Sequence, residues 1–356
     1  MPSASRGRAP EPRELRTALL SWFDATRRPL AWRGTRDPYR IWVAEVMLQQ
    51  TRIAVVEPAY VAFLAAFPDL EALAAASEDD VLSHWSGLGY YSRARALHHA
   101  AREIRSSGGS TFPSEPEAAR ALPGVGPYTA AAVLSIAYGA PLAAVDGNVV
   151  RVLSRLERLA RPDGRGEPHG TLADRLLCRR RPGDWNQALM ELGETICRPI
   201  SPDCEACPVT RWCRARREDA VALHPPPRQR RATERLTVRM TLLRDRGGRL
   251  LLERGAFPYL RHLWLPPTQV EKRAPKTRRE PANAPHRSSF KHNILHREFE
   301  VHVEGRVLAA VDLRRRASEP EDGAERRLFA PNDLASIGRS ALLSKALAAW
   351  NAAGAP

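Results

Sequence analysis

The sequence predicts a larger all-α domain over residues 14–223, followed by a smaller α+β domain over residues 235–351. Three observations carry this prediction. Apolar residues recur at helical spacing from Glu14 to about Ala222, and Gly and Pro separate the segments. After His224 the apolar residues alternate instead, as they do in half-buried strands. A stiff, basic, proline-rich linker over residues 224–234 stands between the two patterns.

Length and charge set the broad class of the protein. The chain has 356 residues, enough for two domains with their own cores, and residues 1–13 are expected to form a disordered tail. The net charge of +15 favours nucleic acid as partner, although an arginine-rich genome gives the same balance. No apolar run is long enough for a bilayer, and no secretory signal is evident. We therefore expect a monomer that binds no membrane and is cytoplasmic, associated with a bacterial nucleoid.

The helices of the first domain are predicted from apolar residues that share one face of each segment. No convincing strand precedes His224. The predicted helical segments are Leu15–Asp24, Tyr39–Thr51, Ala59–Phe67, Asp79–Trp85, Ala94–Arg105, Tyr128–Tyr138 and Val149–Leu159.

The second domain is predicted from period-2 alternation and turn residues. Gly247 and Gly248 separate two apolar runs, which indicates a β-hairpin. A stretch rich in charge, Pro and Ala is expected to be a flexible loop. The predicted elements are strands over 236–242 and 249–253, a loop over 271–289, paired strands over 299–303 and 307–311, and a closing helix over 340–350.

Four cysteines share one short loop with the spacing Cys197-x6-Cys204-x2-Cys207-x5-Cys213. Four thiolates suit zinc or an iron–sulfur cluster. Two disulfides are the alternative, which an intracellular chain disfavours. A zinc ribbon has two C-x2-C knuckles set well apart, whereas this loop has one. The fifth thiol, Cys178, lies in an apolar helical stretch and is expected to pack in the core.

The segment Leu122–Thr129 predicts a tight connection between two helices. Gly124 and Gly126 permit a turn with positive φ, and Pro127 suits the first position of the next helix. Such a turn exposes backbone N–H groups at a helix N-terminus, where they can hold a phosphate. A simple packed connection is the alternative.

Glu45 stands on the apolar face of a predicted helix that Asp37 can cap and Pro38 can open. Burying a carboxylate as an anion is costly, so its pKa is expected to rise toward neutrality. A carboxyl group of that kind can donate or accept a proton near pH 7. The alternative is a core glutamate paired with an arginine.

Asp146 precedes the predicted helix over 149–159 and has two possible roles. An isolated aspartate at this place is by default an N-cap. The competing interpretation is a second carboxylate that faces a developing positive charge.

The segment Gly87–Arg95 joins glycines, tyrosines and arginines before a helix. It has the parts needed to insert Tyr90 into a base stack and to hold phosphates with Arg93 or Arg95. A packed corner is the alternative.

These motifs occur together, and in this order, in the helix-hairpin-helix DNA glycosylase superfamily. They most closely resemble its adenine DNA glycosylases of the MutY type, and the resemblance runs from about Leu15 to Leu223. The second domain resembles more weakly the family's Nudix-like C-terminal domain, which recognises the mismatch. The residues that carry the resemblance are Glu45 with residues 47–51, residues 87–95, residues 122–129, residues 145–149 and the four-cysteine loop.

The resemblance implies one [4Fe–4S] cluster on the four cysteines and a double-stranded DNA partner. It implies that adenine mispaired with 8-oxoguanine or guanine is flipped out and its N-glycosidic bond hydrolysed. Glu45 matches the acid that protonates adenine N7, and Asp146 matches the carboxylate that stabilises the oxocarbenium-like sugar. Supporting matches are Tyr128 and Asn148 in the same site, Trp32, Arg33 and Gln187 near the extruded base, and Gln50 and Tyr90 in the opened base stack.

The nearest alternative is the endonuclease III type, a glycosylase with lyase activity. In that type a lysine follows the hairpin glycines and forms a Schiff base, whereas Tyr128 stands there in this chain. No lysine precedes Lys272, so we predict a monofunctional glycosylase. The remaining alternatives are a DNA-binding protein of the same fold without catalysis and a redox sensor that uses the cluster.

The second domain departs from the family at the Phe-Ser-His turn that contacts 8-oxoguanine. The best match, Ile294-Leu295-His296, keeps only the His. Recognition is expected to be weaker or to involve Asn293 or Lys291, which predicts reduced discrimination between 8-oxoguanine and guanine. The carboxylates around residues 297–300 are also too sparse to hold catalytic magnesium, so nucleotide hydrolysis is not expected.

Overall fold

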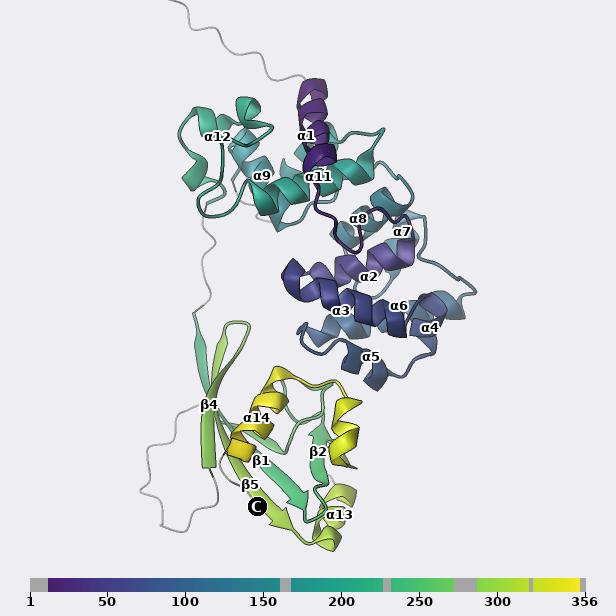
Figure 1. Cartoon of the computed structure of the whole chain (residues 1–356), viewed down its shortest axis with the longest axis vertical. Helices are drawn as coiled ribbons and strands as arrows, with labels where there is room; N and C mark the ends of the chain where they lie inside the picture. The colour runs from purple at the N-terminus through teal and green to yellow at the C-terminus, as the bar shows by residue number, and fades with distance from the viewer. Residues whose placement is uncertain (1–11, 161–167, 227–231, 272–286, 320–322, 353–356) are drawn as a thin grey trace, which may run out of the picture. The chain divides into compact units, whose positions relative to one another are not determined.

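The computed structural model describes residues 12–160, 168–226, 232–271, 287–319 and 323–352 (Figure 1). The chain divides into two compact units. The first comprises residues 1–74 and 99–229, and the second comprises residues 75–98 and 230–356. The predicted disordered tail falls almost wholly outside the described residues, as do the middle of the linker and most of the predicted loop over 271–289. The predicted domain limits, 14–223 and 235–351, stay predictions.

The predicted helical segments before His224 are confirmed, and the described residues there contain no strand. Pro opens α2, α8 and α11 at the first position, where its missing N–H costs no hydrogen bond. None of the described helices is long and apolar enough to cross a membrane. The α-helices are α1 (Pro12–Thr26), α2 (Pro38–Leu48), α3 (Ile53–Ala66), α4 (Leu70–Ala75), α5 (Glu78–His84), α6 (Tyr91–Ser106), α7 (Pro116–Ala121), α8 (Pro127–Ala137), α9 (Gly147–Glu157), α10 (Pro168–Leu176), α11 (Pro182–Thr195) and α12 (Arg214–Arg217).

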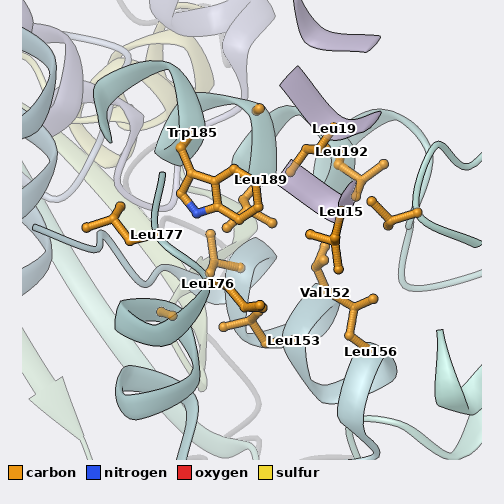
Figure 2. Packing of buried hydrophobic residues seen from close by; sticks show 14 of the residues in the cluster. Leu15, Leu19, Val152, Leu153, Leu156, Leu176, Leu177, Trp185, Leu189 and Leu192 are labelled. Atoms are coloured by element: carbon orange, nitrogen blue, oxygen red, sulfur yellow. The ribbon is translucent and has the colours of Figure 1, made fainter. Parts of the chain in front are cut away.

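One core of the first unit is formed by the apolar faces of α1, α9, α10 and α11. Figure 2 shows Trp185 at one side of this core, near Leu177 and Leu189. Cys178, Cys197, Cys207 and Cys213 pack against the same cluster at its edge. The expected core packing of Cys178 is thereby confirmed, and the four-cysteine loop is anchored to the helix that carries Gln187.

The second unit contains a mixed sheet with the strand order β4-β5-β1-β2-β6, and β3 pairs with β1. β1 and β5 run parallel, while the other pairs are antiparallel. In β5, Phe299, Val301 and Val303 are buried, as the alternation predicts. Helix α14 packs on β4 and β5 (Figure 1). The elements are β1 (Glu234–Asp245), β2 (Leu250–Arg254), β3 (Thr268–Glu271), β4 (Arg287–Ile294), β5 (Arg297–Leu308), α13 (Ala310–Ser318), β6 (Glu325–Phe329) and α14 (Ala341–Ala352).

The predicted hairpin around Gly247 and the closing helix are confirmed, but two predictions for this unit are wrong. The predicted strand over 307–311 does not pair back on 299–303, because β5 continues to Leu308 and α13 begins at Ala310. Leu313 is buried against Leu243 and Leu251, and this packing holds α13 in place. The predicted loop over 271–289 ends earlier than expected, since β4 begins at Arg287.

Candidate active site

A cavity of about 760 Å³ lies in the first unit and is lined by residues of α2, α8, α9 and α11. It brings together side chains that are far apart in the sequence. The sequence-predicted site residues that line it are Trp32, Arg33, Glu45, Gln50, Gly124, Gly126, Tyr128, Asp146, Asn148 and Gln187.

Glu45 reaches this cavity from α2, which is buried along most of its length. The Asp37 carboxylate caps the helix by accepting hydrogen bonds from the N–H groups of Tyr39, at 2.9 Å, and Arg40, at 3.3 Å. Glu45 is only 6% exposed, and burial raises its pKa to about 7. The hydrogen bond from Tyr128 opposes this rise, while the nearby charge of Asp146 adds to it. Glu45 is therefore poised to exchange a proton near neutrality, as predicted.

Tyr128 is the hydrogen-bond partner of Glu45. It is the second residue of α8, directly after the hairpin glycines, and its hydroxyl donates to Glu45 Oε2 at 2.7 Å. Burial and the neighbouring carboxyl groups raise the pKa of Tyr128 well above its usual value. The phenol therefore keeps its proton and orients the Glu45 carboxyl group. Arg33, whose charge opposes the rise in the pKa of Glu45, forms its ion pair with Glu191 instead.

Asp146 is the N-cap of α9 and also lines the cavity. Its Oδ1 accepts the Val149 N–H at 2.7 Å, and its Oδ2 accepts the Asn148 side-chain amide at 3.1 Å. Burial raises the pKa of Asp146, whereas these hydrogen bonds favour the ionised form and oppose the rise. The N-cap interpretation of Asp146 is therefore confirmed, and the same carboxylate also lines the cavity that holds Glu45.

Asn148 links the cavity wall to the four-cysteine loop through Arg151. Arg151 Nη2 donates to Asn148 Oδ1 at 2.8 Å, and Arg151 Nε donates to the Cys197 carbonyl at 2.8 Å. Gly193 of α11 permits this close approach, since a Cβ there would lie 2.7 Å from the Asn148 Cβ. The loop thus helps to hold the side chain that orients Asp146.

An ion-pair network that the sequence did not predict forms another wall of the cavity. Glu191 is 3% exposed and accepts hydrogen bonds from Arg33 Nη2 at 2.7 Å and Arg28 Nε at 2.5 Å. The Nη1 of Arg33 is buried and has no hydrogen-bond partner among the described residues. Glu191 lies one helical turn after Gln187 on α11, and this shared face is the signal that sequence reasoning missed.

Trp32 and Gln187 complete this wall. Trp32 is buried and packs edge-on against Tyr60, with 5.5 Å between the ring centroids. The side-chain amide of Gln187 donates to the Gly183 carbonyl at 3.3 Å. Both residues line the cavity.

Gln50 stands at the cavity rim just after α2, in a left-handed backbone conformation with φ of 58°. Its neighbour Gln49 donates from Nε2 to the buried Thr129 hydroxyl at 3.2 Å, which ties this turn to α8. The hairpin turn is also left-handed at Gly124, where φ is 74°. Gly126 is the N-cap of α8, and space beside it is open, as backbone phosphate binding requires.

The four cysteines of the loop are free thiols with mutual electrostatic influence. Burial raises the pKa of Cys207 to about 12. Arg155 Nη1 donates to Cys197 Sγ at 3.2 Å, and the Cys213 thiol donates to the Arg155 carbonyl at 3.4 Å. Within the described residues, no three His, Cys, Asp or Glu side chains are arranged to hold a single metal ion.

Tyr90 and Arg93 belong to the second unit and are not part of this cavity. Tyr90 lines another cavity, of about 560 Å³, together with Asn293 and Leu295. Leu295 forms the tight turn between β4 and β5, with φ of 57° and 66% of its side chain exposed. His296 does not line this cavity, and its carbonyl accepts the Glu234 N–H at 3.0 Å.

The chain is similar to known DNA repair proteins. Residues 43–167 match the family model of the HhH-GPD superfamily base excision DNA repair proteins. A human adenine DNA glycosylase is 44% identical over 218 residues, which cover 56% of this chain and 39% of the relative. The Mycolicibacterium smegmatis adenine DNA glycosylase is 40% identical over 202 residues, covering 54% of this chain and 68% of the relative. The chain thus spans about two fifths of the human relative that it matches.

A solved structure of a thermostable thymine-DNA glycosylase is also similar. It is 30% identical, with a TM-score of 0.54, and the match covers 58% of this chain and 97% of that chain. The helical fold of the first unit is therefore that of DNA glycosylases.

Proposed function

The chain belongs to the adenine DNA glycosylase family, and on this premise we propose that it excises adenine mispaired with 8-oxoguanine or guanine in double-stranded DNA. The reaction is hydrolysis of the N-glycosidic bond of a flipped nucleotide. The observation that carries the proposal is the buried Glu45–Tyr128 pair, with 2.7 Å between its oxygens, which shares a cavity with Asp146.

Glu45 acts as the general acid. Adenine is a poor leaving group, so its ring nitrogen must gain a proton as the bond to the sugar breaks. A carboxyl group with a pKa of about 7 is protonated in a useful fraction of molecules at neutral pH. Tyr128 fixes the orientation of that carboxyl group, and the same group then accepts a proton from the attacking water.

Asp146 stabilises the positive sugar. Two hydrogen-bond donors hold its carboxylate in place at the start of α9. A negative charge fixed in a buried cavity lowers the energy of an oxocarbenium-like transition state, because little reorganisation is needed. Glu45 and Asp146 thus divide the proton donor and ion stabiliser roles, as paired carboxyl groups do in glycoside hydrolysis.

The network around Arg33 is suited to hold the extruded base. Its buried Nη1 is a donor without a partner among the described residues and lies at the cavity wall. A purine offers acceptor nitrogens on its ring, which would satisfy this donor. The proposal therefore assigns the purine to this wall and the sugar to Asp146.

The position of Tyr128 makes the enzyme monofunctional. A lyase step needs an amine that forms a Schiff base with the sugar, and no lysine precedes Lys272. Borohydride should therefore fail to trap an efficient covalent adduct with DNA, and efficient trapping would reject a monofunctional mechanism.

We propose that the four cysteines hold one [4Fe–4S] cluster. They lie in one loop with the spacing Cys197-x6-Cys204-x2-Cys207-x5-Cys213, and they influence each other electrostatically. Positive metal charge would stabilise thiolates that burial otherwise disfavours. Such a cluster would supply a cross-link for the loop that, through Arg151, supports Asn148.

Metal analysis tests the cluster independently of activity. We expect a yellow-brown protein with equal amounts of iron and sulfide. Cys204→Ser should lose the iron and melt at lower temperature, whereas Cys178→Ser should retain both iron and colour. A colourless zinc protein would refute the cluster.

Residues 235–351 of the second unit are proposed to form a Nudix-like domain that recognises the base opposite adenine. Its α+β sheet and the cavity beside Asn293 and Leu295 support this role. Leu295 cannot supply a hydroxyl group to that base, so weak discrimination between 8-oxoguanine and guanine is proposed. Hydrolysis of free nucleotides is not part of the proposal.

Alkali-developed strand cleavage of a duplex with one mispair tests the function. Adenine opposite 8-oxoguanine and adenine opposite guanine should both be cleaved. Thymine opposite guanine serves as the competing substrate, because the similar solved structure is a thymine-DNA glycosylase. Glu45→Gln should abolish cleavage, whereas Glu103→Gln, at an exposed position, should not. Cleavage of thymine alone would overturn the assignment of adenine.

A further inference from the structure

The turn before α6 holds Tyr90 in an unfavourable backbone conformation. Gly87 and Gly89 have φ of 92° and 68°, which glycine adopts freely, but Tyr90 also has a positive φ, of 47°. A residue with a Cβ remains in this region only when its surroundings determine it. Tyr90 is 41% exposed, so few of those surroundings can come from contacts of its own ring.

Arg93 provides much of this support. Its guanidinium lies 5.4 Å from the centroid of the Tyr90 ring and 5.5 Å from that of Trp85. Its Nη2 donates to the carbonyls of Leu88, at 3.3 Å, and Gly89, at 3.2 Å. Arg93 thus contacts both the peptide groups of the turn and the face of the tyrosine ring, and Trp85 Nε1 supports the turn by donating to the Gly89 carbonyl at 3.1 Å.

We propose that Arg93 is a positioning residue that holds Tyr90 ready for insertion into the DNA base stack, and that Arg93 is not a phosphate ligand. The inference rests on the proposed function, which makes Tyr90 the inserted residue. It replaces the role in phosphate binding that the sequence suggested for Arg93.

The surroundings of the guanidinium support this role. Burial lowers the pKa of Arg93 to about 10, which indicates a group withdrawn from water. The Nη2 of Arg93, which a phosphate ligand would direct toward the solvent, donates instead to two backbone carbonyls of the turn. The guanidinium also lies over two aromatic rings at once, and its planar, delocalised charge suits this arrangement better than the compact ammonium of lysine.

Salt dependence separates the two roles. We expect Arg93→Met to lower the single-turnover excision rate at least tenfold while the slope of log affinity against log salt stays at the wild-type value. Loss of a phosphate contact would reduce the slope by about 0.9. Such a reduction, or rescue of the rate by Arg93→Lys, would overturn the proposal. Arg102→Met, which removes an exposed charge on the same helix, measures the effect of net charge alone.

A double-mutant cycle tests whether Arg93 acts through Tyr90. In a Tyr90→Ala background, Arg93→Met should cause no further loss of rate, because the residue that it positions is gone. Additive losses would show an independent role and reject the proposal. Comparison of melting temperatures identifies variants that fail to fold, and Arg93→Gln, which keeps one donor group, then replaces Arg93→Met.

Insertion can be observed without excision, which separates this inference from the proposed function. A duplex with 2-aminopurine beside the mispair should become more fluorescent when wild-type protein inserts Tyr90 and unstacks the neighbour. Arg93→Met should bind the duplex without this rise. If the fluorescence of 2-aminopurine still rises with Arg93→Met, the proposed positioning role of Arg93 is wrong, whether or not the variant excises adenine. If the wild type shows the rise but excises no adenine, only the proposed function fails.

Discussion

The cavity of the first unit and the cavity of the second unit differ in the chemistry of their walls. The lining of the first cavity includes the buried carboxyl groups of Glu45 and Glu191, the partly buried carboxyl group of Asp146 and the Tyr128 phenol. Burial raises the pKa of Glu45, Asp146 and Tyr128, whereas the arginines around Glu191 lower its pKa. The second is lined mainly by glycines, leucines, aromatic rings, imidazoles and Asn293, with no carboxyl group among its described lining residues.

Under the proposed function, this difference reflects opposite requirements of bond cleavage and base recognition for the residues that line a cavity. Bond cleavage needs ionisable groups in the cavity wall. Removing these groups from water costs free energy, and interactions within the folded protein must compensate for that cost. Recognition needs shape and neutral hydrogen-bonding groups, which burial penalises less. Substitutions that alter ionisation should therefore have large effects in the first cavity, and shape changes should have small effects in the second.

Glu45→Gln should give the largest effect. Removal of the general acid is expected to lower the single-turnover rate by about a thousandfold, because the leaving base is no longer protonated. The carboxamide of the substituted side chain would still accept the Tyr128 hydrogen bond, so folding should be preserved. A single-turnover rate of the variant within tenfold of the wild-type rate would show that Glu45 is not the general acid.

The same substitution should stabilise the fold at high pH. The folded pKa of Glu45 is about 7, against 4.5 for the free group, so folding favours the protonated form. As pH rises from 4.5 to 7, the unfolded chain ionises first, and folding loses roughly 3 kcal/mol by pH 7. Glutamine does not ionise, so the stability of the variant does not fall with pH for this reason. The melting temperature of the variant relative to wild type should therefore rise between about pH 5 and pH 8.

The pH dependence of the wild-type rate should give the next largest effect. If Glu45 must be protonated, the single-turnover rate should fall roughly tenfold per unit above pH 7, or about a hundredfold by pH 9. Affinity for the duplex, measured in parallel, should change far less. A rate that is flat to about pH 9 would mean that another group donates the proton.

Glu191→Gln tests the ion-pair network that holds Arg33. The substitution leaves two partly buried arginines near a neutral group, and should destabilise the protein by about 3 kcal/mol. The expected measurement is a lower denaturation midpoint, accompanied by a smaller loss of rate than Glu45→Gln causes. Glu103→Gln should leave the midpoint unchanged.

Sequence reasoning succeeded where local pattern determines the structure. Glu45 on an apolar helix face predicted a raised pKa, and Asp146 before a helix predicted an N-cap; both are confirmed. It failed for the ion pair of Glu191 with Arg33, because 158 residues separate the partners. The helix face that Glu191 shares with Gln187 indicates its place in the cavity wall but does not reveal its partner.

The same limit explains the errors in the second unit. The parallel pairing of β1 with β5 joins distant segments, and alternation within one strand does not reveal the partner. Helix α13 is held by burial of Leu313 against β1 and β2, whereas the apolar residues at 307–311 suggested a strand. Tertiary packing decided the structure where local propensity was ambiguous.

Leu295→Ser should give the smallest effect and addresses the second cavity. The substitution introduces a hydroxyl group at the exposed turn between β4 and β5, and should raise the preference for 8-oxoguanine over guanine about threefold to tenfold, as one added hydrogen bond would. Leu295→Ala is the matched control, since it removes the same side chain without adding a hydroxyl group. Equal preferences for the two variants would show that shape alone governs the second cavity. A change in the maximal excision rate would show that the walls of the two cavities are not functionally separate.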